Sequence, residues 1–347
     1  MTKHVKLNTS SAQLILDSLI KSNAQVQVVS KRFKLLKITH QNKVSFLKGA
    51  SFPANPHPSC FIANNKWLTK KVLKLANILT PRSYLAQTQL QARKIINTKN
   101  MFPCVLKPSK GAHGNHVYAN IETNQELEDI MPNLFPDQGK KDVLIEEFVS
   151  GRDYRVMVVG DKISAIMERI PAHVIGDGVH TLRQLITKFN NDPRVGKKYE
   201  KPVCKIRLNG EVKRNLKKIN VNLSHIPALN KQFFLRQNAN ISTGGIGKDA
   251  TLEAPKIVRT TAIKAAKALG MNISGVDILY NPLNQKAYVL ELNARPGIDI
   301  HHYPVIGQSQ DVANDIVEYL LSPQPDSIES GEDINTLEQA PLFNENI

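Results

Sequence analysis

Two hydrophobic segments near the C-terminus each carry oxygen-bearing side chains. Gly275 to Leu279 contains Asp277, and Val289 to Asn293 contains Glu291 and Asn293. The two segments have the pattern of a β-hairpin, and alternation along a strand puts Glu291 and Asn293 on one face. Carboxylate and amide oxygens are the ligands that Mg²⁺, or alternatively Mn²⁺, takes beside nucleotide phosphates. The hairpin therefore predicts a metal site made by Asp277, Glu291 and Asn293.

A lysine followed by a glycine-containing loop is suited to binding a polyphosphate. Lys107 follows the hydrophobic strand 102–106, and Ser109, Gly111 and Gly114 lie in the loop after it. The lysine supplies a point charge, and glycines let backbone N–H groups approach phosphate oxygens. The loop matches neither G-x-x-x-x-G-K-[ST] nor G-x-G-x-x-G, so an ordinary turn stays an alternative.

Two further groups could complete such a site. The strand 143–149 ends in adjacent carboxylates that could accept a hydrogen bond from an adenine amine, and Asp153 follows where it could accept from ribose hydroxyls. The segment 236–245 combines guanidinium, amide and hydroxyl groups with two glycines, which suits a transferred phosphoryl group or the oxyanion of an acyl phosphate. Read alone, the first could be an exposed strand end and the second a surface turn.

Several catalytic classes are excluded because their motifs are absent from the sequence. The sequence contains no G-x-S-x-G and no H-E-x-x-H, and its Arg152-Asp153 pair lacks the context of a protein kinase. The neighbouring His301 and His302 have no third partner for a metal, which favours packing or contact with an anionic substrate.

Strands and helices must position these groups, and the hydrophobic pattern predicts both. Strands are expected over 26–29, 35–38, 44–47, 102–106, 117–121, 143–149, 154–159, 163–170, 276–280 and 287–292. Helices are expected over 11–20, 67–79, 123–131, 179–190, 256–269 and 310–321. The lysine-rich stretch 192–223 fits neither pattern.

Charge is distributed unevenly along the 347 residues. The 46 Lys and Arg residues against 30 Asp and Glu give +16, but the last 25 residues hold six acidic and no basic side chains. Residues 1–322 therefore carry +22, the difference between 46 and 24. Such a field attracts nucleotides, acidic metabolites or acidic polymers, although a solvated lysine-rich surface would explain it as well. Nucleic acid is disfavoured because aromatic residues are only 6% of the chain and no nucleic-acid-binding motif occurs.

The chain has no apolar run of membrane-spanning length and no signal-peptide core at its start. Its three cysteines are widely spaced and form neither a disulfide framework nor a zinc pattern. The expected location is the cytoplasm, without membrane association.

Taken in order, these motifs resemble the ATP-grasp superfamily of carboxylate–amine ligases. The likeness is closest to the glutathione-synthetase module of bifunctional γ-glutamate–cysteine ligase/glutathione synthetases and to the ATP-grasp module of cyanophycin synthetases. It rests on seven segments in the expected order: 65–73, 105–108, 148–155, 169–178, 240–245, 275–277 and 291–297. The resemblance implies an α+β fold with α/β character, in which a small N-terminal α/β lobe precedes two α+β lobes that clasp ATP.

The resemblance also implies domain bounds. The N-terminal lobe would span 1–64 and the ATP-grasp domain 65–322, with the nucleotide-clasping lobe at about 80–150 and the metal and substrate lobe at about 151–322. Residues 323–347 would form an acidic, disordered tail.

Site residues follow from the same resemblance. Phosphates would be contacted by Lys70, Lys107 and the loop with Ser109, Gly111 and Gly114. Adenine would be bound by Glu146 and the backbone of Glu147, Phe148 and Val149, and ribose by Asp153. Mg²⁺ would be held by Asp277, Glu291 and Asn293. The acyl phosphate would face Arg236, Asn240 and the loop from Ser242 to Gly245, with Arg295 and His173 as substrate contacts.

The implied reaction is phosphorylation of a carboxylate by ATP, followed by attack of an amine on the acyl phosphate. Glutathione-synthetase-like chemistry, joining γ-glutamylcysteine and glycine, is the favoured substrate prediction. A cyanophycin-synthetase-like or RimK-like ligase that adds an amino acid to an acidic peptide or polymer is the alternative, and a non-catalytic nucleotide-binding regulator is the alternative from another class. Partners would be ATP, a small-molecule or peptide carboxylate and an amine, with homo-oligomerisation left open.

Overall fold

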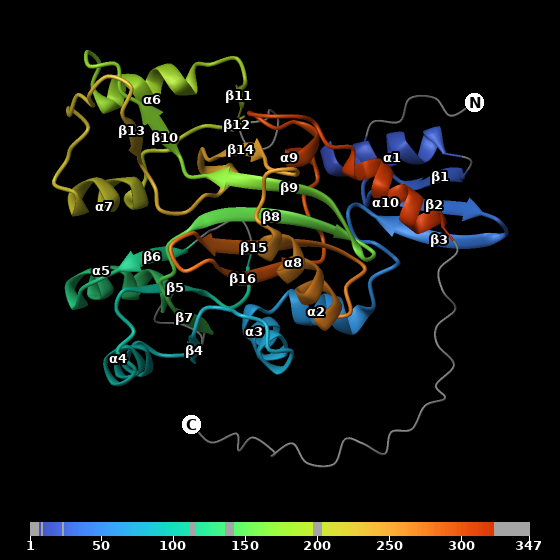
Figure 1. Cartoon of the computed structure of the whole chain (residues 1–347), viewed down its shortest axis with the longest axis horizontal. Helices are drawn as coiled ribbons and strands as arrows, with labels where there is room; N and C mark the ends of the chain where they lie inside the picture. The colour runs from blue at the N-terminus through green and yellow to red at the C-terminus, as the bar shows by residue number, and fades with distance from the viewer. Residues whose placement is uncertain are drawn as a thin grey trace.

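The computed structural model describes residues 7, 10–22, 24–111, 116–135, 142–196 and 203–322, and the fold is given for these. Gly114 and the tail 323–347 lie outside the described residues. The chain forms a small N-terminal lobe, a central five-stranded sheet, a four-stranded lobe beside it and an insertion (Figure 1). No helix in the described ranges is long and apolar enough to cross a membrane.

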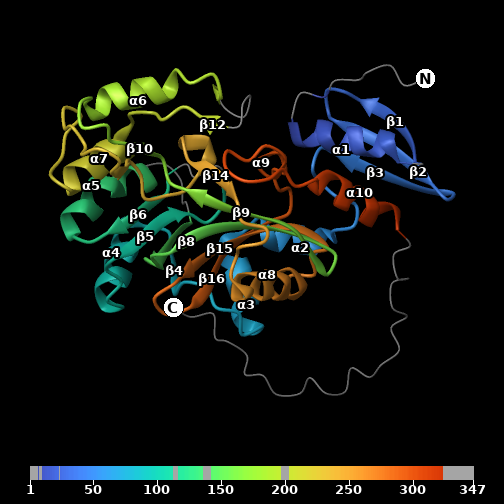
Figure 2. The ribbon, with the colours of Figure 1, turned by 45° about the horizontal axis from the view of Figure 1, so that its top comes forward.

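The small lobe combines both ends of the described chain. Its antiparallel sheet contains β1 (Gln25–Ser30), β2 (Leu35–His40) and β3 (Lys43–Lys48) in that order. Helix α1 (Ser10–Lys21) buries Ile15 and Leu19 in a core that also contains Leu36 of β2 and Ile316 of α10 (Val312–Leu321). Figures 1 and 2 show α10 lying beside α1.

The four-stranded sheet forms the second lobe. Its order is β4-β7-β5-β6, from β4 (Ser83–Ala86), β7 (Val143–Glu147), β5 (Cys104–Pro108) and β6 (Tyr118–Ile121). Helices α4 (Gln89–Thr98) and α5 (Asn124–Leu134) contribute Ile96 and Leu127 to the core of this lobe. Before it come α2 (His57–Ala63) and α3 (Lys66–Leu75), and the Asn65 side chain caps α3 by accepting from the N–H groups of Trp67 and Leu68.

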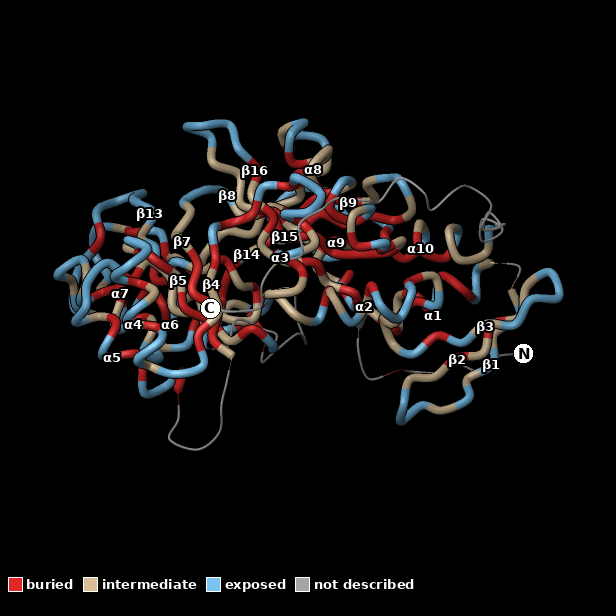
Figure 3. The backbone as a smooth tube through the Cα atoms, turned by 90° about the horizontal axis from the view of Figure 1, so that it is seen from below, coloured by how far each residue is buried: buried red, intermediate tan, exposed pale blue. Residues whose placement is uncertain are grey.

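The central sheet is buried on two faces. Its order is β14-β9-β8-β15-β16, from β14 (Ile246–Asp249), β9 (Lys162–Ile170), β8 (Arg152–Val159), β15 (Ile273–Asn281) and β16 (Lys286–Asn293). Val156 and Val158 of β8 pack with α8 (Lys256–Ala268), whereas Met157 and Val159 pack with the small lobe. Because strand residues alternate between the faces, burial of both explains the consecutive hydrophobic residues from Val156 to Val159 of β8. Figure 3 shows the resulting buried centre of the molecule.

The insertion lies between β9 and β14. It contains β10 (His173–Ile175), α6 (Leu182–Asn190), β11 (Val195–Gly196), β12 (Val203–Cys204), α7 (Gly210–Lys218), β13 (Gln232–Phe234) and the 3₁₀ turn η2 (Ile241–Thr243). A core of its own includes Leu185 of α6, Leu216 of α7 and Leu235. After β16, the short helix α9 (Asp299–His302) leads to α10.

Most predicted elements are found, with shifted ends. The hairpins 154–159/163–170 and 276–280/287–292 correspond to β8–β9 and β15–β16. The helix expected over 67–79 ends at Leu75, and Asn77 beyond it has a left-handed φ of 55°. Strands β4 and β10 to β14 and helices α2, α4, α7 and α9 were not predicted. Of these, β11, β12 and α7 lie in the stretch that fitted no pattern.

Candidate functional site

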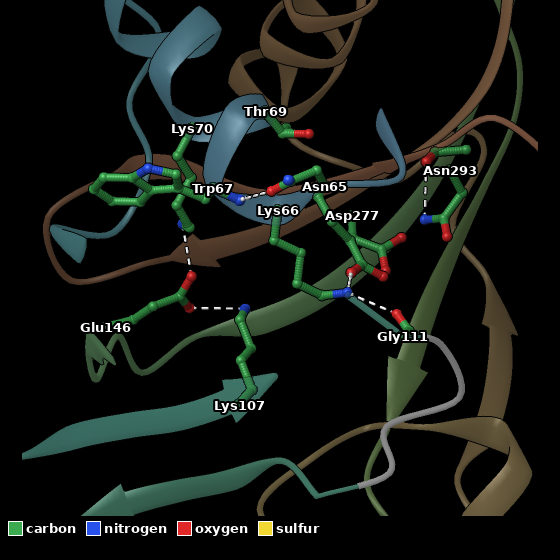
Figure 4. A network of polar contacts seen from close by, with 12 residues as sticks. Asn65, Lys66, Trp67, Thr69, Lys70, Lys107, Gly111, Glu146, Asp277 and Asn293 are labelled. Carbon is green, nitrogen blue, oxygen red and sulfur yellow. Dashed lines mark hydrogen bonds and ion pairs between the residues drawn. The ribbon is translucent and has the colours of Figure 1, made fainter. Parts of the chain in front are cut away.

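Two buried lysines share one buried carboxylate beside the inner strands of the four-stranded sheet. Lys70 on α3 and Lys107 on β5 lie 2.9 and 2.8 Å from the two carboxylate oxygens of Glu146 on β7 (Figure 4). Their exposed fractions are 1% for Lys70, 7% for Lys107 and 2% for Glu146. Two cations with one anion leave an excess positive charge, which suits an anionic ligand.

Burial changes the ionisation of this group. It lowers the pKa of Lys70 to about 8, although Glu146 partly opposes the shift. Burial alone would raise the pKa of Glu146, but Lys107 and Lys70 hold it below its usual value. Lys70 also donates to Thr80 Oγ1 at 2.8 Å, and Thr80 in turn donates to the carbonyl of Val289 on β16, which links the cluster to the central sheet.

Lys66 connects the predicted phosphate loop with the predicted metal site. Its Nζ lies 3.0 Å from Glu291 Oε2 and donates to the carbonyl of Gly111 at 2.9 Å (Figure 4). Its backbone N–H donates to the carbonyl of Ser109, a buried residue. Lys66 was not among the predicted site residues, although it lies in a segment that carries the resemblance, and the contacts that identify it are long-range.

The predicted metal ligands lie on paired strands. Asp277 on β15 is opposite Glu291 on β16, and the register shifts next to this pair, so Ile278 faces Val289. Glu291 and Asn293 flank the buried Leu292, as strand alternation predicts. Asn293 donates its Nδ2 to the carbonyl of Gly275 at 3.2 Å, which leaves Oδ1 for coordination.

Two arginines bind Asp277 from the neighbouring strands. Arg155 on β8 makes a two-point contact with its carboxylate, and Arg169 Nη2 on β9 lies 3.0 Å from Asp277 Oδ2. Burial by itself would raise the pKa of Asp277, but Arg155 and Arg169 lower it to about 2. Arg169 also binds Asp153, the predicted ribose ligand, through Nε at 2.8 Å from Oδ1.

The oxygen donors fit a divalent cation of the Mg²⁺ type. Asp277, Glu291 and Asn293 provide two carboxylates and an amide, and the carboxylates are balanced by Arg155, Arg169 and Lys66. No cluster of three or more His, Cys, Asp or Glu side chains in the described segments could hold a metal ion. A cation here would therefore be coordinated by the Asn293 amide and by phosphate oxygens of a bound nucleotide, in addition to the two carboxylates.

The predicted acyl-phosphate residues lie in the insertion. Arg236 is buried and pairs with Glu211 of α7, and it donates to Asn209 Oδ1 at 2.8 Å. Asn240 caps η2, and its Oδ1 accepts from the backbone N–H and the hydroxyl of Ser242. Contact between Arg236 and an acyl phosphate would require an exchange of these partners.

The remaining predicted residues have separate surroundings. His173 Nδ1 lies 2.8 Å from the carbonyl of Pro171, and the ring lies against Phe234. Arg295 is exposed in the loop after β16. The backbone N–H groups of Glu147 and Phe148 donate to the carbonyls of Arg82 and Pro103, so β7 and its extension are held on two sides. Val149 and Phe148 are half-buried.

Comparison with known proteins identifies the family of this chain. Residues 63–174 and 215–320 match the RimK-like ATP-grasp domain. The chain belongs to the family of RimK-like ATP-grasp domains. The ATP-grasp resemblance and the predicted fold class are therefore confirmed.

Relatives of this ATP-grasp domain include larger enzymes. It is 30% identical over 317 residues to the glutathione biosynthesis bifunctional protein GshAB of Listeria welshimeri, covering 90% of this chain and 41% of that protein. It is 32% identical over 271 residues to cyanophycin synthetase of Crocosphaera subtropica, covering 77% and 31%. The crystal structure of a bifunctional glutathione synthetase from Pasteurella multocida matches with a TM-score of 0.64 at 26% identity, covering 89% and 43%. The chain thus spans less than half the length of these relatives.

Proposed function

We propose that this chain is an ATP-dependent carboxylate–amine ligase that acts through an acyl phosphate. The observation that carries the proposal is the double contact of Lys66 with Glu291 and the carbonyl of Gly111, since it joins the oxygen-ligand hairpin to the loop after Lys107. A polyphosphate held by the lysines would therefore lie next to a cation held by Asp277, Glu291 and Asn293.

The reaction needs positioning and charge neutralisation more than an enzyme nucleophile. Lys70, Lys107 and Lys66 would bind the negative charge of the phosphates, and Arg155 and Arg169 would orient the Asp277 carboxylate. Mg²⁺, when bound, would neutralise charge that develops on the phosphates during transfer. The amine would then attack the acyl carbon and release phosphate.

The substrates we propose are γ-glutamylcysteine and glycine. The similarity to GshAB proteins over 90% of this chain supports this choice. The similarity to cyanophycin synthetase, together with the +22 charge of residues 1–322, favours a second candidate in which an amino acid is added to an acidic peptide or polymer.

Mg²⁺-dependent ADP release with a panel of acids and amines tests the proposal, with products identified by mass spectrometry. Release that requires γ-glutamylcysteine and glycine, with a product of glutathione mass, is the expected result. Release with an acidic peptide and an amino acid would select the second candidate. If the protein binds ATP but releases no ADP with any acid and amine pair of the panel, the result would contradict the ligase proposal and favour a nucleotide-binding regulator. Lys107→Met is the control, because it should abolish release in every active pair.

A further inference from the structure

Helix α7 of the insertion presents one face to the four-stranded lobe. Glu211, Arg214, Asn215 and Lys218 recur at the three- and four-residue spacing that places side chains on one side of a helix. In Figures 1 and 2, α7 lies beside α5 and β6. Lys213 and Lys217 lie on another side, where they line a groove of about 690 Å³ between α6 and α7.

Cations on this face bind the backbone of β6. Lys218 Nζ donates to the carbonyl of Asn120 at 2.6 Å, and Arg214 Nη2 donates to the carbonyl of Ala119 at 3.3 Å. The pairing of β6 with β5 includes Tyr118 and Ile121 and shifts register between them. Because β6 is also an edge strand of the described sheet, α7 supplies donors on the side away from β5.

Further contacts surround these two bonds. Lys218 lies 3.0 Å from Glu122 and 3.5 Å from Glu126, both in the four-stranded lobe. The Arg214 guanidinium lies 5.6 Å from the ring centroid of Tyr118, a cation–π distance. Two side chains of one helix thus contact five residues of the other lobe between Tyr118 and Glu126.

The opposite end of α7 binds the predicted acyl-phosphate residues. Glu211 in its first turn pairs with Arg236, and its second oxygen accepts from Asn238 Nδ2 at 2.7 Å. Gln237 donates to Asn215 of the same helix at 3.1 Å. Helix α7 therefore spans the distance between the segment that begins at Arg236 and the strand that follows the phosphate loop.

We propose that Arg214 and Lys218 are positioning residues that hold the acyl-phosphate segment at reacting distance from the nucleotide. This inference rests on the proposed function. Phosphoryl transfer depends on alignment of donor and acceptor, and a small misplacement of either lobe lowers the rate strongly. Neither residue needs to touch ATP or the carboxylate, since they hold α7 against β6 while Glu211 of the same helix binds Arg236.

Hydrogen exchange of the nucleotide-free protein tests the contact without any substrate. Lys218→Met should speed exchange of peptides that cover β6 as well as α7, although β6 lies in the other lobe. Lys217→Met is the matched control, because Lys217 is an exposed lysine of the same helix on its other side. Unchanged exchange of β6 in Lys218→Met would overturn the proposal.

Kinetics then tests the positioning role. Lys218→Met should bind Mg²⁺ and the non-hydrolysable analogue AMP-PNP within about twofold of wild type, whereas kcat should fall about tenfold or more at unchanged KM for ATP. Lys218→Arg should restore part of kcat. Equal kcat in Lys218→Met and wild type would overturn positioning even if exchange changes. Failure of the wild type to bind AMP-PNP or to turn over any substrate pair would instead refute the proposed function.

Discussion

At the scale of residues, the site depends on how buried charges are balanced. Glu146 compensates one of its two lysines, so the cluster of Lys70, Lys107 and Glu146 keeps an excess positive charge that suits an anion. Asp277 is balanced by two arginines in the same way. The charged groups of the two clusters come from α3, the four-stranded sheet and the central sheet. Their spacing in the sequence does not indicate which cation lies next to which carboxylate.

The pKa of Lys70 predicts how nucleotide binding depends on pH. The pKa is about 8 in the folded protein, so Lys70 loses its charge as the pH rises above 8. A polyphosphate prefers the charged lysine, and affinity for Mg²⁺ and AMP-PNP should therefore fall between pH 7.5 and 9.5, by up to about tenfold per unit above the pKa. Isothermal titration calorimetry measures this dependence. Lys70→Met should bind more weakly at pH 7.5 and show a flatter profile, and a flat wild-type profile would contradict the assignment.

The same lysine predicts a change in stability. Its pKa is lower in the folded protein than the usual 10.5, so the unfolded chain binds more protons between pH 8 and 10.5. The contribution of Lys70 to the free energy of unfolding therefore rises with pH in this window. Comparison of wild type with Lys70→Met by urea denaturation at pH 7.5 and 9.5 isolates this contribution.

Two substitutions separate metal binding from folding. Glu291 is half-buried and pairs with Lys66, so Glu291→Gln should keep the fold and raise the Mg²⁺ concentration for half-maximal ADP release about tenfold or more. Asp277→Asn should also lower turnover, but it leaves Arg155 and Arg169 without their shared carboxylate and should reduce the free energy of unfolding by about 3 kcal/mol. Mg²⁺ titrations and urea denaturation measure the two effects. A normal Mg²⁺ requirement in Glu291→Gln would exclude Glu291 as a ligand.

At the scale of elements, sequence patterns predicted what local periodicity determines. The hairpin of β15 and β16 is hydrophobic on two faces and has turn residues between its strands. Both the hairpin and the placement of Glu291 and Asn293 on one face of β16 could therefore be predicted. The register shift beside Asp277 could not, because it depends on the fit between neighbouring strands. Helix α7 was missed because four of its nine residues are basic and only Val212 and Leu216 are hydrophobic. Its place is determined by contacts with Arg236 and β6 instead.

The insertion depends on a close approach at Gly176, where a side chain has no room. A Cβ at this position would lie 2.2 Å from the carbonyl oxygen of Ala228 and 2.7 Å from that of Pro227. Gly176→Ala should therefore displace the segment after α7 and destabilise the insertion by about 1–3 kcal/mol, while binding of AMP-PNP to the other lobe changes little. Hydrogen exchange measures the first effect and calorimetry the second.

Gly210 provides the control for this substitution. It begins α7, and a Cβ there would meet no atom of the described residues within 4 Å. Gly210→Ala should leave stability unchanged or raise it slightly, because alanine restricts the unfolded chain. Equal effects of the two substitutions would show that backbone freedom, not the close approach, determines the result.

At the scale of the whole molecule, elements distant in sequence build each unit. The small lobe takes α10 from the end of the described chain, and Asn55 binds the backbone of Ile273 in the central sheet through both its amide atoms. The ATP-grasp architecture could be predicted because the seven segments that resemble this superfamily occur in the expected order along the sequence. The domain bounds, the site residues and the cytoplasmic location stay predictions.

Net charge gives a prediction that involves the whole chain. Truncation after Ser322 removes six acidic residues and changes the net charge from +16 to +22. If the tail acts only through its charge, truncation should lower the KM for an anionic carboxylate substrate about two- to threefold at 20 mM NaCl and leave kcat unchanged. The difference should disappear at 500 mM NaCl, because the Debye length falls from about 20 Å to about 4 Å.

A full-length variant with the six carboxylates replaced by amides separates charge from contact. It has the same net charge as the truncated chain, so it should reproduce the lower KM and its loss at high salt. A truncation effect that persists at 500 mM NaCl, or a change in kcat that the amide variant lacks, would show that the tail acts by binding to the body. Steady-state ADP release at the two salt concentrations distinguishes these cases, because screening weakens long-range attraction but leaves closely packed contacts largely intact.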